Sequence, residues 1–156
     1  MRALLVTGTP ITGSFPAFKP DGTNTAAEQA QQMGQNHDGM EFYPLDDNGN
    51  RGLLVINHEY SNSTLFPGDG RSEDANGAPT DPDQVRKDIN AHGVAIIEVE
   101  RDSTGKVSVV QGSSYNRRIT AATPMQMSGP AAGDALLRTA YDPSGMTTRG
   151  TVNNCA

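Results

Sequence analysis

The sequence is poor in the residues that build a large hydrophobic core. Among its 156 residues tryptophan is absent, aromatic residues make up 5% and hydrophobic residues 35%. Soluble domains have about 45–50% apolar residues when glycine is counted. The 17 glycines and 10 prolines indicate many turns. We therefore expect short strands joined by long polar loops.

Further absences limit the classes of partner. The net charge is −6 and there is no basic stripe, which argues against binding to nucleic acid or anionic membranes. No apolar run approaches the length of a membrane span, and residues 1–6 are too short for a signal peptide. The single cysteine, Cys155, cannot form an internal disulfide, so cysteine content does not decide the compartment. An acidic chain suits cations, and phosphate chemistry on it would need metals to supply positive charge.

Two hairpins dominate the pattern along the chain. The first spans residues 36–60 and turns at Asn48-Gly49, a strong hairpin signal. The second spans residues 92–111 and turns at 102–105, with β-branched residues on both arms. An irregular lead-in occupies 1–35, a polar loop and a short helix occupy 61–91, and a loop-rich tail occupies 112–156. The sequence predicts one all-β domain over 1–156, made mainly of antiparallel hairpins with a few short helices.

Local signals refine this prediction. Asp81 is placed to cap a helix over residues 81–91 with Pro82 at its first position, and short helices also fit within 24–33 and 134–140. The run Leu53–Ile56 is apolar without alternation, which is typical of a strand buried on both faces. Two successive hairpins, each preceded by a histidine (His37 and His92), fit about one blade of a β-propeller plus part of the next. A sandwich or barrel remains the alternative.

Two similar motifs mark the ends of the first hairpin. Asn36-His37-Asp38-Gly39 precedes its first strand and Asn57-His58-Glu59 ends its second. Antiparallel pairing brings these ends together, so Asp38 and Glu59 are expected at one rim, with imidazole and amide groups beside them. Such ligands suit iron, calcium or manganese. The alternative is a turn held by asparagine and aspartate hydrogen bonds.

Cys155 and Arg117 are the other candidate functional residues. As a thiolate, Cys155 is a metal ligand, although a free cysteine is often simply a small buried residue. Arg117 belongs to the only basic pair in the strand-rich region, and its guanidinium matches the geometry of a phosphate group. The alternative is a solvated loop end.

Six motifs in order give the chain a family resemblance that spans nearly its whole length. They are NHDGMEFYPL (36–45), GLLVINHEY (52–60), AHGVAIIEVE (91–100), SYNRRITAATPM (114–125), GPAAG (129–133) and GTVNNCA (150–156). The chain resembles the PhoX-type alkaline phosphatases. The resemblance implies a β-propeller exported by the twin-arginine route to the periplasm or the exterior, and a phosphatase that hydrolyses phosphate monoesters with Fe³⁺ and Ca²⁺.

The resemblance also implies roles for individual residues. Cys155 matches the iron-binding cysteine, and Asp38 and Glu59 fall in family motifs as metal ligands. His58 and Asn154 are further metal ligands by the same comparison, and Arg117 is expected to hold the transferred phosphoryl group.

Family chains are much longer, so we expect this chain to be an N-terminal part of such an enzyme, inactive alone and prone to self-association. The alternatives are a non-catalytic calcium-binding propeller module and a propeller hydrolase of another class, phytase-like or lactonase-like.

Overall fold

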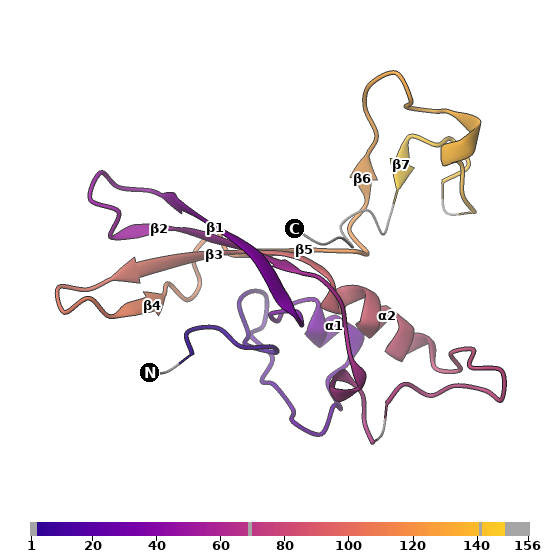
Figure 1. Ribbon diagram of the computed structural model, residues 1–156, viewed down its shortest axis with the longest axis horizontal. Helices are drawn as coiled ribbons and strands as arrows, with labels where there is room; N and C mark the ends of the chain where they lie inside the picture. The colour runs from indigo at the N-terminus through magenta and orange to yellow at the C-terminus, as the bar shows by residue number, and fades with distance from the viewer. Residues whose placement is uncertain (1–2, 69, 141, 149–156) are drawn as a thin grey trace.

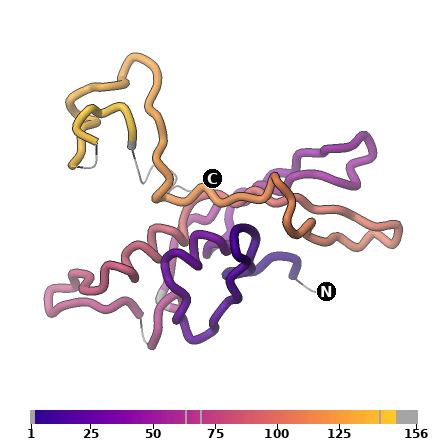
Figure 2. Tube along the Cα trace, turned by 180° about the vertical axis from the view of Figure 1, so that it is seen from behind, coloured from indigo at the N-terminus to yellow at the C-terminus, as the bar shows by residue number. Residues whose placement is uncertain are grey.

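The computed structural model describes residues 3–68, 70–140 and 142–148. Their main feature is a five-stranded antiparallel sheet, with helices and the lead-in on one side of it in both views (Figures 1 and 2). The sheet confirms the prediction of mainly antiparallel structure with few short helices. No helix within these ranges has both the length and the apolar composition needed to cross a bilayer.

The sheet is built from the two hairpins. It contains β1 (His37–Pro44), β2 (Arg51–His58), β3 (Gly93–Arg101), β4 (Val107–Val109) and β5 (Arg117–Thr120). β2 pairs with β3 over its whole length, so the hairpins join in one sheet. β4 and β5 share the outer edge of β3, β4 beside Val99–Arg101 and β5 beside Gly93–Ile96. The two hairpins and β5 thus form one sheet, and the propeller blade stays a prediction.

The helices are short and begin where local capping directs. α1 (Ala26–Gln29) follows a capping box in which Thr25 and Glu28 satisfy each other's backbone amides. α2 (Pro82–Ala91) begins after Asp81, whose carboxylate accepts from the amides of Asp83 and Gln84. Two single turns of 3-10 helix, η1 (Ser63–Leu65) and η2 (Ala135–Leu137), complete the set. The helix expected within 134–140 is therefore a single 3-10 turn.

The hydrophobic core lies on the face of the sheet that the lead-in covers. The pairing register and strand alternation place Leu54, Ile56 and Ile97 on this face, and they belong to one cluster with Ile11 and Met33 of the lead-in. A second, smaller cluster joins Leu65, Phe66 and Ala91. Beside it the buried Lys87 donates to the Gly22 carbonyl at 2.6 Å, which ties α2 to the lead-in.

The C-terminal part of the described chain stands away from the sheet. β6 (Met125–Gln126) and β7 (Thr147–Thr148) pair antiparallel, and with η2 they form a separate small unit in both views (Figures 1 and 2). The chain reaches this unit through β5, whose first residues lie in the segment predicted to be a loop (112–118). β5 forms because it pairs with the edge of β3 near Gly93, and no local sequence pattern predicts this pairing.

Candidate functional site

The structure brings the two Asn-His-acid motifs together at the open end of the β1–β2 hairpin. His37 and His58 are direct partners in the register. Beyond them the Glu59 amide donates to the Asn36 carbonyl at 3.0 Å, and the Asn36 side chain donates to the Tyr60 carbonyl at 2.6 Å. The predicted meeting of the motifs is therefore present in the backbone. We call Asp38 and Glu59 the rim carboxylates.

The two histidines lie on the opposite side of the sheet from the rim carboxylates. Successive side chains of a strand alternate between faces, so His58 shares the core face with Ile56, whereas Glu59 belongs to the other face. Asp38 sits in a bulge between His37 and Met40, and both rim carboxylates are half-buried. The histidine rings meet edge to face with centroids 4.9 Å apart.

His58 is held as a neutral, enclosed imidazole. Its exposed fraction is 0%, and a Cβ on Gly34 would lie 2.6 Å from its Cγ. Burial, followed by the charges of Arg118 and His37, lowers the pKa of His58 to about 2, although the Gln35 backbone opposes this shift. Neither ring nitrogen has a hydrogen bond of good geometry within the described residues. The described residues thus enclose the ring on the core side of the sheet, and its role as a metal ligand stays a prediction.

The adjacent arginines of β5 also divide between the two faces. Arg117 is exposed, on the face of the rim carboxylates, and donates to the Tyr115 carbonyl at 3.4 Å. It pairs with Ile96, which pairs with Val55. Glu59 lies four residues further along the strand direction than Arg117, which is roughly 13 Å, and two strands across the sheet, which is roughly 10 Å. The structure therefore places Arg117 on the right face but not in contact with the rim.

Arg118 is the functional candidate that the sequence did not single out. Its guanidinium donates to the carbonyls of Gln32 at 2.5 Å, Asn90 at 3.0 Å and His92 at 2.9 Å. Burial lowers its pKa to about 9. The signal was present in the sequence, since two consecutive arginines in a strand must point to opposite faces, but this segment was predicted to be a loop.

The remaining predicted ligands, Cys155 and Asn154, lie outside the described residues. Within the described ranges no group of three or more His, Cys, Asp and Glu side chains could hold a metal ion. Two carboxylates at one rim are oxygen ligands of the kind that calcium prefers, but they do not complete a coordination sphere. The described residues therefore fit part of a metal site only.

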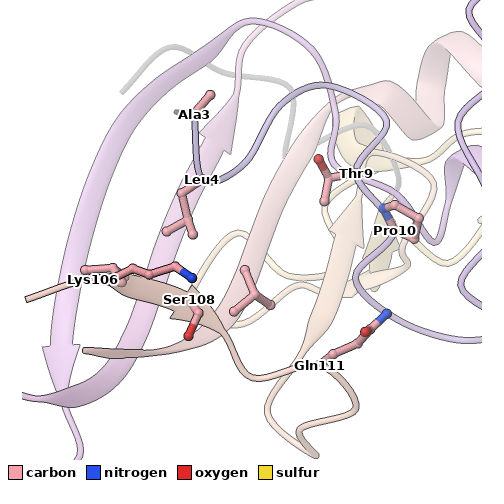
Figure 3. A pocket seen from close by; sticks show the side chains of 9 residues that line it. Ala3, Leu4, Thr9, Pro10, Lys106, Ser108 and Gln111 are labelled. Carbon is pink, nitrogen blue, oxygen red and sulfur yellow. The ribbon is translucent and has the colours of Figure 1, made fainter. Parts of the chain in front are cut away.

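A pocket in a different place has a volume of about 680 Å³. It lies between the lead-in and β4, where Leu4, Pro10 and Lys106 line it (Figure 3). Lys106 is its only charged lining residue. No carboxylate lines it, so this pocket offers no metal ligands and is not the predicted site.

Comparisons with known proteins agree with the resemblance seen in the sequence motifs. The family model described as alkaline phosphatase PhoX matches residues 1–156. A solved structure of Pseudomonas fluorescens PhoX, in complex with vanadate as a transition-state analogue, is similar with a TM-score of 0.88 and 42% sequence identity. The similarity covers 99% of this chain and 26% of that one, so the chain spans about a quarter of the relative's length. A search of curated proteins gives no match. Because the family model matches the whole chain, the chain belongs to the PhoX family of alkaline phosphatases.

Proposed function

We propose that the chain forms one part of a metal-dependent alkaline phosphatase that hydrolyses phosphate monoesters. The observation that carries this proposal is the match to the P. fluorescens protein, at 42% identity over 99% of this chain. That protein binds vanadate, a transition-state analogue. The geometry adds support, because Asp38 and Glu59 meet at one rim and Arg117 projects from the same face.

Each of these residues has a distinct proposed role. The rim carboxylates supply oxygen ligands for Ca²⁺, and Cys155, with Asn154 beside it, supplies a thiolate for Fe³⁺. When bound, these ions neutralise the ester oxygens and activate water as the nucleophile. Arg117 holds the transferred phosphoryl group through its guanidinium. His58, whose buried ring nitrogens have no hydrogen bond of good geometry among the described residues, is proposed as a further metal ligand.

The face of the sheet that the described residues cover only in part supports a propeller in the complete enzyme. Leu53, Val55 and Val94 lie on the face opposite the core and are half-buried. A sheet packed between neighbouring sheets needs apolar side chains on both faces. We therefore propose that further sheets cover this face, as in a propeller, and that this part alone is inactive.

Export to the periplasm or the exterior by the twin-arginine route is proposed from family membership. Fractionation of a cell that produces the protein, with and without a working twin-arginine pathway, tests it. Retention of the protein in the cytoplasm with the pathway intact contradicts this proposal.

A hybrid enzyme tests the proposed activity. The matching 26% of P. fluorescens PhoX is replaced by this chain, and hydrolysis of para-nitrophenyl phosphate is measured together with bound calcium and iron. We expect Asp38→Asn and Glu59→Gln to lower bound metal and kcat/KM, and Arg117→Met to lower kcat about 100-fold with metal retained. Asp47→Asn, in an exposed turn, is the matched control.

The outcomes separate the alternatives. Calcium binding without turnover in a folded hybrid supports a non-catalytic calcium module. Turnover of other esters or lactones, with none of phosphate monoesters, supports a hydrolase of another class. Full activity and metal content in both carboxylate variants contradicts the proposed ligand set.

A further inference from the structure

Arg118 joins three segments that are distant in the sequence. From its place on β5, its guanidinium reaches the carbonyl of Gln32 in the lead-in and those of Asn90 and His92 at the end of α2. The hydrogen bond to Gln32 spans 86 positions of the chain. No other described side chain donates to carbonyls of both the lead-in and α2.

This arrangement is unusual for a half-buried cation. Within the described part of the chain no carboxylate lies within ion-pair distance of Arg118, and its Nε is buried without a partner. Carbonyls in the last turn of a helix lack intrahelical donors and carry partial negative charge. The Asn90 and His92 carbonyls are thus the groups that compensate the cation.

The carbonyls that Arg118 binds precede two strands: β1, which carries Asp38, and β3, which pairs with β2 up to His58, the neighbour of Glu59. From Gln32 the chain runs through Gly34 to Asn36 and Asp38, with little freedom because a Cβ on Gly34 would lie 2.1 Å from the Ala91 carbonyl oxygen. His92 precedes Gly93, the register partner of His58.

We propose that Arg118 is a positioning residue for the rim carboxylates. By fixing the backbone before β1 and before β3, it sets where Asp38 and Glu59 stand relative to each other. That the two carboxylates bind metal rests on the proposed function. That Arg118 fixes the backbone around them does not.

The test compares Arg118→Met and Arg118→Lys with Arg101→Met as the matched control. Arg101 is exposed and binds Asn50 at the far end of the sheet. Hydrogen exchange in the hybrid enzyme follows the amides of Gln35 and Glu59, which donate to Ala91 and Asn36. The Leu45 amide, which donates to Arg51 at the opposite end of β1, reports global opening.

We expect Arg118→Met to speed exchange at Gln35 and Glu59 roughly 10-fold while Leu45 is unchanged. Arg118→Lys should recover part of the protection, since an ammonium can bind some of the same carbonyls. In the hybrid enzyme Arg118→Met should weaken calcium binding, measured by displacement of luminescent terbium, about 10- to 100-fold, as loss of an outer-shell partner does. Arg101→Met should alter neither measurement.

Equal acceleration at all three amides would show a general stabilising role and overturn the proposal, as would unchanged exchange at Gln35 and Glu59. Should Arg118→Met not fold, Arg118→Lys decides by the same local comparison. If Arg118→Met loosens the rim locally but Asp38→Asn and Glu59→Gln leave calcium affinity intact, the proposed function fails and the positioning role stands.

Discussion

Glu98 shows how a single residue acquires a role that its local sequence conceals. Strand alternation places Glu98 and Glu100 on the same face of β3, yet Glu98 is 1% exposed whereas Glu100 is an exposed residue. The difference comes from the loop before β5, where Ser113 donates to the Glu98 carboxylate and Asn116 accepts from its amide at 2.8 Å. Arg51 completes the set as an ion pair.

We predict that Glu98 makes the stability of the protein depend on acidic pH. The hydrogen bonds from Arg51 and then Ser113 lower its pKa below the usual 4.5. Its contribution is therefore fully present above about pH 4.5 and is lost as pH falls through the lowered value. Glu98→Gln should reduce the free energy of unfolding by about 1 kcal/mol at neutral pH and flatten the loss at acidic pH. Denaturant titrations from about pH 7 to 3 measure the free energy of unfolding and its dependence on pH, with Glu100→Gln as the control. Identical pH profiles for the two variants would contradict the prediction.

Elements were predictable where their determinants are local. The start of α2 follows from Asp81 and Pro82 alone, because the Asp81 carboxylate accepts hydrogen bonds from backbone amides only two and three residues further along the chain. β5 was missed because Arg117–Thr120 gains strand structure only by pairing with Gly93–Ile96. The same long-range pairing places Arg117 and Arg118 on opposite faces of the sheet. The sequence could therefore identify a basic pair, but it could not predict that the two arginines have different surroundings.

The helix cap gives a prediction at this scale. Asp81→Ala removes the acceptor for the amides of Asp83 and Gln84 and should lower the free energy of unfolding by about 1 kcal/mol. Arg86→Ala, at an exposed position of the same helix, should change it by less than about 0.5 kcal/mol. Denaturant unfolding followed by circular dichroism provides the values. Equal stabilities for the two variants would show that the cap does not support α2.

At the scale of the whole molecule, the sequence predicted the two hairpins that build the sheet, but not which of its two faces is covered. The apolar run Leu53–Ile56 predicted burial on both sides, whereas the described residues cover one face fully and the other only in part. Ile56 is 2% exposed against the lead-in, whereas Leu53 and Val55 on the other face are half-buried. The related chain is about four times as long, and we propose that the additional residues of such a chain form the sheets that cover the second face.

The half-covered face leads to the prediction that the 156-residue chain associates in solution. Apolar side chains that have no covering sheet gain free energy by contact with a second copy, and the open edge of β1 offers backbone groups for pairing. Light scattering should give an apparent mass that rises with concentration. Leu53→Thr combined with Val55→Thr should lower that rise, because both changes lie on the uncovered face. Met40→Thr, 59% exposed on the core side of β1, serves as the control and should leave association unchanged. A monomer with a cooperative melt at all concentrations would show instead that the lead-in and helices alone suffice to stabilise this sheet, and that its second face tolerates water.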